Sequence, residues 1–323
     1  MNHSIKEPVI ILGCPRSGTS LLFTILSESE KLFSLYRESQ DIFDSFYRLQ
    51  AKNFKVYEDD ALTEDDLTDE LKEFFLNEFH KYSLNTRPVG YVMREYFLKN
   101  DLLEGFSNAV TSINRTYKNI FAKEYRLVEK NPRNCFRISF INKLFPDCKF
   151  IYLKRDGRSN ISSLIEGWRR KTNYSRIPRP AIPLNIKGDN YGKWRYVLPP
   201  DWERYINKPL EEVCAYQWIS SNKAVIDSLK SIENDRKISI GYEELSNNTT
   251  ETIIKLCNFI NIPYSEGIKR FSEKPPVVST PKKDKPKEDK WKKNEQLIQN
   301  ISTIIKPMMI QLGYETKKEE IKV

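Results

Sequence analysis

The chain has 323 residues, of which 39% are hydrophobic and 30% are charged. This apolar content is enough for a packed core in one large α/β domain and excludes disorder for most of the chain. No apolar run approaches the ~20 residues of a membrane-spanning helix, so we expect a soluble protein without a secretory leader.

The 53 Lys and Arg residues exceed the 44 Asp and Glu residues, giving a net charge of +9. Much of this excess lies near the C-terminus, where residues 282–293 contain seven lysines and three acidic residues. A nucleic-acid-binding surface would spread basic residues along helices or alternate them with aromatic residues. The local concentration therefore favours a small anionic ligand and indicates no nucleic-acid partner.

The cysteines and histidines limit the chemistry open to the chain. Its five cysteines are widely spaced and odd in number, so we expect reduced thiols and a cytoplasmic location. His3 and His80 are its two histidines, too few to favour a zinc site or a Ser-His-Asp triad.

Short apolar segments alternate with helical patterns along the chain. The first is a predicted strand at 9–12, followed by a small-residue loop at 13–18 and an amphipathic helix at 21–26. Further strands are expected at 127–128, 148–153 and 238–240, and further helices at 135–145 and 157–168. This alternation predicts an α/β fold with a parallel β-sheet flanked by helices.

Two regions interrupt the alternation. Residues 39–123 carry polar helical segments without strand character, and we expect them to form a mainly helical insertion. The Pro-rich residues 177–200 are expected to form a long loop. We predict one domain spanning residues 1–323, with this insertion and a basic C-terminal loop at 279–293.

The loop at 13–20, Gly-Cys-Pro-Arg-Ser-Gly-Thr-Ser, has the Gly-x-x-x-x-Gly frame of a P-loop-type nucleotide-binding fold. Such a loop turns backbone N–H groups toward an anion at a helix N-terminus. A nucleoside triphosphatase would carry Lys where Thr19 stands, to reach the phosphates beside Mg²⁺. Here the cation is Arg16, which disfavours Mg-ATP. The frame alone is equally compatible with an ordinary connection.

A second motif follows the predicted strand at 148–153. Arg155 comes just after the strand, Asp156 is a candidate N-cap, and Ser163 lies two helical turns further on, on the face that begins beside Arg155. Taken alone, the segment is also compatible with a capped surface helix with solvated serines. Together, the two motifs would hold a nucleotide with phosphates at both ends of its ribose.

These motifs resemble those of sulfotransferases that use 3′-phosphoadenosine-5′-phosphosulfate (PAPS), particularly the bacterial branch and the related tyrosylprotein enzymes. VIILGCPRSGTSLL resembles their 5′-phosphosulfate loop, and FIYLKRDGRSNISSL resembles their 3′-phosphate motif. The resemblance covers residues 8–40, 126–170 and 236–265. It is weak in the insertion and at 172–205, where acceptor specificity is expected.

The resemblance implies roles for individual residues. The 5′-phosphosulfate is expected at Arg16, Ser17, Gly18, Thr19 and Ser20. The 3′-phosphate is expected at Arg155 and Ser163, with Tyr242 lining the nucleotide site. A basic loop at 279–291, including Lys290, is expected to close over the 3′-phosphate, although a solvated segment is an equal alternative.

PAPS is thus the expected donor, and no metal is expected. Transfer to a hydroxyl or amine needs a base for the acceptor proton and cations where negative charge builds on the leaving phosphate. Arg16 and Lys130 are the expected catalytic cations. Glu38 is the expected base, by similarity to tyrosylprotein-type enzymes, and His80 is its rival. A glutamate beside an arginine is also commonly just an ion pair.

Other readings of the sequence remain open. A nucleotide or nucleoside kinase and a catalytically inactive anion-binding protein are the competing functions. The acceptor is expected to be a carbohydrate, lipid-linked or small molecule. Aromatic and basic residues between 168 and 202 are candidates to contact it or to pack within their own loop: Arg169, Arg170, Lys171, Tyr174, Tyr191 and Trp194.

Overall fold

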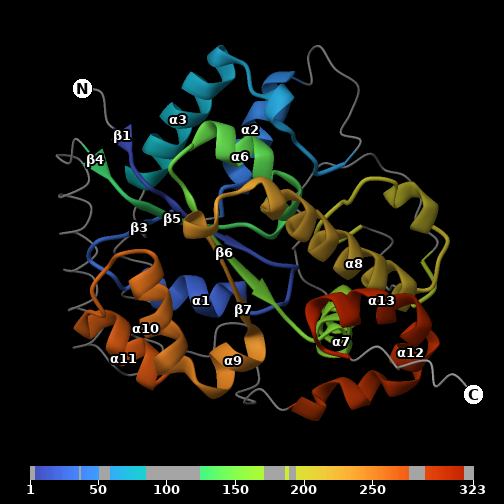
Figure 1. The fold of residues 1–323 in the computed structure, drawn as a ribbon. Coiled ribbons are helices and arrows are strands. Elements are labelled where there is room, and N and C mark those ends of the chain that lie inside the picture. Colours follow the sequence, from blue (N-terminus) through green and yellow to red (C-terminus); the bar gives the residue numbers. More distant parts are fainter. Residues whose placement is uncertain are drawn as a thin grey trace, which may run out of the picture.

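Five parallel strands form the main sheet in the described part of this computed structural model (Figure 1). The structure describes residues 4–35, 38–50, 59–84, 124–170, 186–188, 194–275 and 288–315. In spatial order the strands are β3 (Phe33–Ser34), β5 (Leu127–Lys130), β2 (Val9–Leu12), β6 (Lys149–Lys154) and β7 (Lys237–Gly241). Because all neighbours pair in parallel, their carboxyl ends meet at one edge.

The central strand β2 is buried on both faces. Val9 and Ile11 join one apolar cluster, whereas Ile10 and Leu12 join the other. This alternation follows from the two-residue period of a strand. A strand that is apolar at every position is typical of a parallel sheet covered by helices on both sides.

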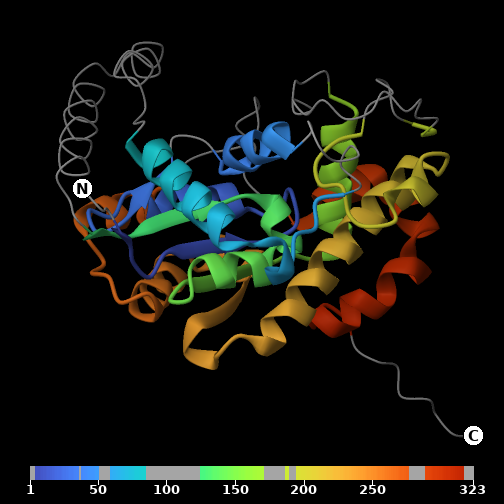
Figure 2. The same ribbon diagram turned by 90° about the horizontal axis from the view of Figure 1, so that it is seen from above.

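Helices cover both faces of the sheet (Figure 1). The helices of one face are α1 (Thr19–Leu26), α9 (Tyr242–Asn247), α10 (Thr249–Phe259) and α11 (Glu266–Glu273). Those of the other face are α2 (Gln40–Gln50), α3 (Asp69–Leu84), α6 (Ile138–Leu144) and α8 (Leu210–Ser228). Three more helices pack beside α8, as both ribbon views show (Figure 2): α7 (Gly157–Trp168), α12 (Glu295–Asn300) and α13 (Ser302–Leu312).

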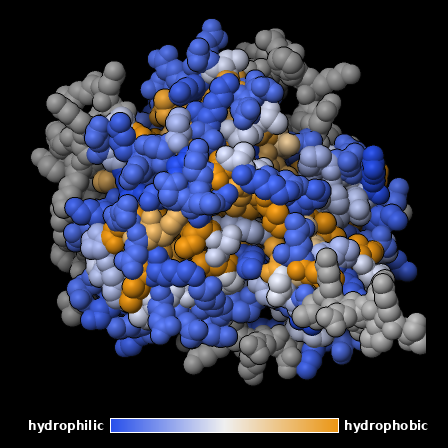
Figure 3. Space-filling model, in the orientation of Figure 1, coloured by the Kyte–Doolittle hydropathy of each residue, from blue (hydrophilic) through white to orange (hydrophobic). Residues whose placement is uncertain are grey.

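Shorter elements complete the described chain. The 3₁₀ turns are η1 (Glu64–Asp66), η2 (Pro132–Phe136), η3 (Trp202–Tyr205), η4 (Leu229–Ser231), η5 (Asn234–Arg236) and η6 (Glu288–Asn294). A small parallel pair is formed by β1 (Ser4–Ile5) and β4 (Glu124–Tyr125). In the described chain, no helix has the length and apolar composition needed to cross a bilayer. Figure 3 shows a largely hydrophilic face with apolar side chains in patches between the polar ones.

The predicted fold class is confirmed, and so are the longer predicted elements. One prediction was wrong in detail: the helix expected at 135–145 is split into η2 and α6 at Arg137, where φ is −133°. The reason is tertiary, because the buried Arg137 side chain donates from Nε to the Asp60 carbonyl at 3.0 Å. The two-residue strands β1, β3 and β4 are too short to show a periodicity, and the sequence did not predict them.

The described parts of the predicted insertion are mainly helical. Residues 40–50 and 69–84 form α2 and α3, whereas 51–58 and 85–123 lie outside the described residues. In the expected long loop, residues 194–200 form neither helix nor strand. The one-domain organisation stays a prediction.

A cluster of three aromatic side chains connects α2 and α3 to α6. The Phe140 ring of α6 lies 5.1 Å from that of Phe75 and 6.0 Å from that of Phe43. All three side chains are fully buried. The aromatic cluster therefore packs α2 and α3 onto α6.

Replacing Phe140 by Ala should lower the free energy of unfolding by about 3–5 kcal/mol, because the cavity removes contacts from three elements. Urea denaturation measures the change. Ile304→Ala is the matched control, since Ile304 is exposed on α13 and its truncation should cost little. Equal midpoints for the two variants would contradict the role of this cluster.

Candidate active site

The carboxyl edge of the sheet gathers most of the predicted site residues. Glu38 follows β3, Lys130 ends β5, the 13–20 loop follows β2, Arg155 follows β6, and Tyr242 follows β7. Since the spatial order is β3-β5-β2-β6-β7, the candidate base and lysine lie on one side of the loop. The candidate 3′-phosphate residues lie on its other side.

The phosphate loop ends at Gly18, the N-cap of α1. Gly18 has φ of 103°, in the left-handed region that favours glycine. A Cβ there would also lie 2.4 Å from the Tyr242 ring. The first turn of α1 has neither a side-chain cap nor an acidic residue. Its N-terminal N–H groups and partial positive charge therefore suit a bound anion.

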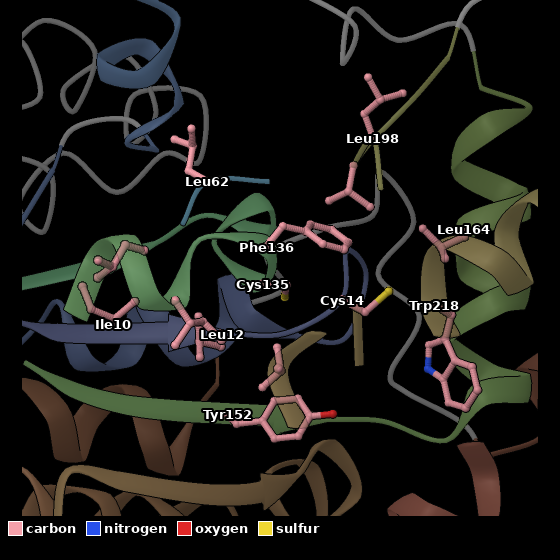
Figure 4. Close-up of a cluster of buried hydrophobic side chains, with 14 of the residues drawn as sticks. Ile10, Leu12, Cys14, Leu62, Cys135, Phe136, Tyr152, Leu164, Leu198 and Trp218 are labelled. Atoms are coloured by element: carbon pink, nitrogen blue, oxygen red, sulfur yellow. The ribbon is translucent and has the colours of Figure 1, made fainter. Parts of the chain in front are cut away.

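The phosphate loop is held in place by apolar packing and by a hydrogen bond from α7. Figure 4 shows the Cys14 side chain in the buried cluster that includes Tyr152 and Trp218. Asn160 of α7 donates from Nδ2 to the Pro15 carbonyl oxygen at 2.8 Å. Burial raises the pKa of the Cys14 thiol well above its usual value, so Cys14 is a core residue and not a nucleophile.

Arg155 connects the two predicted phosphate motifs. Its Nη1 donates to the carbonyl oxygen of Arg16 at 2.7 Å, and Arg16 holds a left-handed φ of 72°. The Arg16 Nε in turn donates to the Ser163 hydroxyl at 3.2 Å. The Arg155 guanidinium also stacks on the Tyr242 ring, 4.3 Å from its centroid. The structure thus brings four of the predicted residues into one cluster.

Arg155 Nε in this cluster and Ser17 Oγ in the adjoining loop are buried and have no hydrogen-bond partner among the described residues. Burial lowers the pKa of Arg155, which signals a cation removed from water without full compensation. A phosphate group at each motif would supply the acceptor oxygens that Arg155 Nε and the Ser17 hydroxyl lack. The residues present therefore fit a doubly phosphorylated nucleotide.

Hydrogen bonds to the carboxylates of Asp156 and Glu243 hold the start of α7 in place. As predicted, Asp156 caps this helix and accepts from the backbone N–H groups of Arg158 and Ser159. Glu243 accepts from the Asp156 N–H at 3.2 Å and from the Tyr314 hydroxyl at 2.7 Å. No sequence pattern pointed to Tyr314, because only the tertiary packing brings the end of α13 to β7.

On the other side of the loop, Lys130 forms an ion pair with Glu38. The Lys130 side chain is 9% exposed, and that of Glu38 is 46% exposed. The carboxylate therefore faces solvent, from which an acceptor can approach. Sequence reasoning proposed both residues, and the structure places them in contact.

Sequence reasoning missed Glu129, the neighbour of Lys130 in β5. Its side chain is 2% exposed, and its carboxylate accepts from Ser39 N at 3.4 Å and Asn134 Nδ2 at 2.5 Å. Burial raises its pKa to about 7, and repulsion from Glu38 acts in the same direction. A charged residue inside an apolar strand was the signal available in the sequence.

The rival base, His80, lies at the opposite end of the sheet. Its Nδ1 is 3.2 Å from the hydroxyl of Tyr125 in β4. Tyr125 precedes Lys130 by five residues of extended chain, a span of about 16 Å. This placement favours Glu38 over His80.

The end of the predicted basic loop packs against α7. Trp291 lies under the Arg158 guanidinium, 5.6 Å from its ring centroid, and Lys293 pairs with Glu166 at 2.9 Å. Asn294 donates to the Ser162 hydroxyl at 2.9 Å. Lys290 is half-buried in the same turn, η6. Residues 279–287 lie outside the described residues.

Of the candidate acceptor contacts, Trp194 belongs to the core. Its ring lies edge-on to Trp168 and Trp202, and its Nε1 donates to the Val197 carbonyl at 2.8 Å. Here the loop packs through its tryptophan against α7 and η3. Lys171, Tyr174 and Tyr191 lie outside the described residues. In the described chain, no group of three or more His, Cys, Asp or Glu side chains is arranged to hold a metal ion.

The raised pKa of Glu129 predicts a pH-dependent stability. Between about 4.5, its ordinary value, and about 7, the folded chain holds a proton that the unfolded chain has released. The free energy of unfolding should therefore fall as pH rises through this window, by on the order of 3 kcal/mol. Denaturation at several pH values should show a smaller fall for Glu129→Gln, and an unchanged pH dependence would contradict the assignment.

Comparisons with known proteins identify the family of the chain. The model of the sulfotransferase family matches residues 8–266. The protein-tyrosine sulfotransferase of Drosophila melanogaster is 23% identical over 148 residues, covering 46% of this chain and 23% of that protein. Protein-tyrosine sulfotransferase 1 of Danio rerio is 24% identical over 204 residues, covering 58% and 48%. The chain thus spans about a quarter and about half the length of these relatives.

Among solved structures, the sulfotransferase domain from the curacin biosynthetic pathway matches with a TM-score of 0.47 and 18% identity, covering 97% of this chain and 99% of that one. The sulfotransferase from Alicyclobacillus acidocaldarius matches with a TM-score of 0.49 and 11% identity, covering 96% and 95%. The family model extends from β2 into α11. Because this model covers well over half of the chain, the chain belongs to the sulfotransferase family, as the resemblance of its two phosphate motifs implied.

Proposed function

We propose that this protein transfers a sulfuryl group from PAPS to a hydroxyl or amine of a carbohydrate, lipid-linked or small-molecule acceptor. The observation that carries the proposal is the joining of the two anion sites: Arg155 binds the Arg16 carbonyl, and Arg16 binds the Ser163 hydroxyl. Family membership supports the donor, and the two buried unpartnered polar atoms support its phosphates.

In this proposal each motif holds one end of the donor. The α1 N-terminus, with Ser17, Gly18, Thr19 and Ser20, binds the 5′-phosphosulfate. Arg155 and Ser163 bind the 3′-phosphate, and Tyr242 lines the nucleotide. Lys290 approaches from η6, which packs on the helix that carries Ser163.

PAPS supplies the sulfuryl group when it is bound. Glu38 accepts the acceptor's proton as the new bond to sulfur forms and the bond from sulfur to the 5′-phosphate breaks. Arg16 and Lys130 offset the negative charge that builds on the leaving phosphate. The ion pair between Glu38 and Lys130 supports these roles, because the proposed base and one of the proposed cations lie side by side.

The competing functions have weaker support. A kinase would need a cation at the Thr19 position, where the loop has none. Turnover of ATP with Mg²⁺ would favour it. An inactive anion-binding protein would not need the Glu38–Lys130 pair at the edge of the site. A cytoplasmic location is supported by the five cysteines, which are all buried free thiols.

The two anion sites predict selective nucleotide binding. Calorimetry should show that 3′-phosphoadenosine 5′-phosphate (PAP) binds far more tightly than AMP or ATP. Arg155→Lys should weaken PAP binding by roughly ten- to a hundredfold, because Lys cannot replace the planar donor fork. Arg204→Lys, at an exposed ion pair on η3, is the control and should bind normally. Equal affinities for PAP and AMP would refute the second site.

Incubating the enzyme with ³⁴S-labelled PAPS and a host-cell extract should add sulfate to an acceptor that mass spectrometry can detect. Glu38→Gln should reduce this incorporation at least ~100-fold, because the acceptor proton loses its base, while PAP still binds. His80→Ala should retain activity. The opposite result for these two variants would identify His80 as the base, and no incorporation by the wild type would reject the proposed activity.

A further inference from the structure

The segment that carries Glu38 is attached to the end of β5 by several side-chain contacts. Lys130 pairs with Glu38. On either side of Lys130, Glu129 accepts from the Ser39 backbone N–H at 3.4 Å, and Asn131 donates to the Ser39 hydroxyl at 3.3 Å. Asn131 also donates to Gln40 Oε1 at 3.2 Å. Residues 38–40 are thus held by residues 129–131.

The two sides of this attachment differ in burial. Glu38 faces solvent, whereas Ser39, Glu129 and Asn131 are almost completely buried. Successive residues of an extended segment point to opposite sides, so Lys130 reaches the open site while Glu129 and Asn131 reach the interior. On the open side, the segment is held by the ion pair between Glu38 and Lys130. An ion pair with one exposed partner restricts a side chain only weakly. The buried side must therefore supply the restraint.

We propose that Glu129 is a positioning residue for sulfuryl transfer, which sets the location of Glu38 by binding the Ser39 N–H from the interior. The inference rests on the proposed function, because its object is the proposed base. Asn134 orients the Glu129 carboxylate by donating to Oε2 at 2.5 Å, which leaves Oε1 for Ser39. Glu129 touches neither donor nor acceptor in this arrangement and acts through the backbone beside Glu38.

The electrostatic environment of Glu129 agrees with this role. The charged groups that act on it are Glu38, before α2, and Lys130, next to it in β5. Burial raises its pKa to about 7, so the carboxylate predominates above neutral pH and the carboxylic acid below it. The carboxylate can accept from Ser39 and Asn134 together, whereas the acid form has one oxygen committed to its own proton. Positioning should therefore weaken below about pH 7.

The test uses the full chain and Glu129→Gln, which keeps the shape and removes the charge. Glu211→Gln is the matched control, since Glu211 is another buried glutamate and accepts from Asn300 on α12 at 3.2 Å. We expect Glu129→Gln to shift the Ser39 amide signal and the Glu38 carboxyl carbon signal in NMR spectra, and the control to shift neither. Unchanged signals in Glu129→Gln would overturn the proposal.

The second experiment measures the transfer rate with ³⁴S-labelled PAPS and the host-cell extract. Glu129→Gln should lower the transfer rate about tenfold, leave PAP affinity unchanged, and remove the fall in rate below about pH 7 that the wild type shows. A purely structural glutamate would lower stability without changing that pH profile. If Glu129→Gln does not fold, Asn134→Leu frees the same carboxylate and should give the same NMR shifts and loss of rate.

The outcomes separate this inference from the proposed function. A wild-type rate and pH profile in Glu129→Gln, with Glu38→Gln inactive, would overturn the positioning role and leave the base intact. Full activity in Glu38→Gln would overturn the proposed base itself. Normal PAP affinity in both variants is expected, because the proposed nucleotide residues lie in the 13–20 loop and on its other side, beside β6 and β7.

Discussion

The hydrogen bond from Arg155 to the Arg16 carbonyl is the contact on which the site depends. It runs from the end of β6 to the loop after β2, and it holds Arg16 in a left-handed conformation that a residue with a side chain adopts only at some cost. The same guanidinium is buried against Tyr242, and its Nε has no hydrogen-bond partner in the described part of the chain. One side chain thus shapes the first proposed anion site and belongs to the second.

The order of the strands places these contacts in a row along the carboxyl edge of the sheet. Neighbouring parallel strands present their carboxyl ends at spacings of about 5 Å, so residues that follow β3, β5, β2, β6 and β7 lie in a row. Residues suited to the acceptor side, the sulfuryl group and the 3′-phosphate occur in that sequence along the edge. In the proposed function, the topology would therefore set the orientation of the donor, and the individual motifs would supply its contacts.

Burial of the Glu129 carboxylate behind Glu38 lowers the stability of the fold. Its proposed positioning role explains why a glutamate stands there. An ionised carboxylate at the position of Glu129 opposes folding, because burial removes its hydration. An apolar residue would pack there without this cost. Retaining a glutamate gives the Ser39 backbone N–H a fixed acceptor directly beside the exposed Glu38.

The sequence by itself determined the parallel α/β fold, the phosphate loop and the Arg155–Ser163 motif, because strand and helix periods and glycine spacing are local properties. It also proposed Glu38 and Lys130, through family resemblance. Only the tertiary structure decided that Glu38 meets Lys130, that Glu129 supports Ser39, and that Tyr314 reaches Glu243. These pairs are separated by about 70 to 90 residues. Strand order brings the first two pairs together and the packing of α13 brings the third, and no local pattern encodes either.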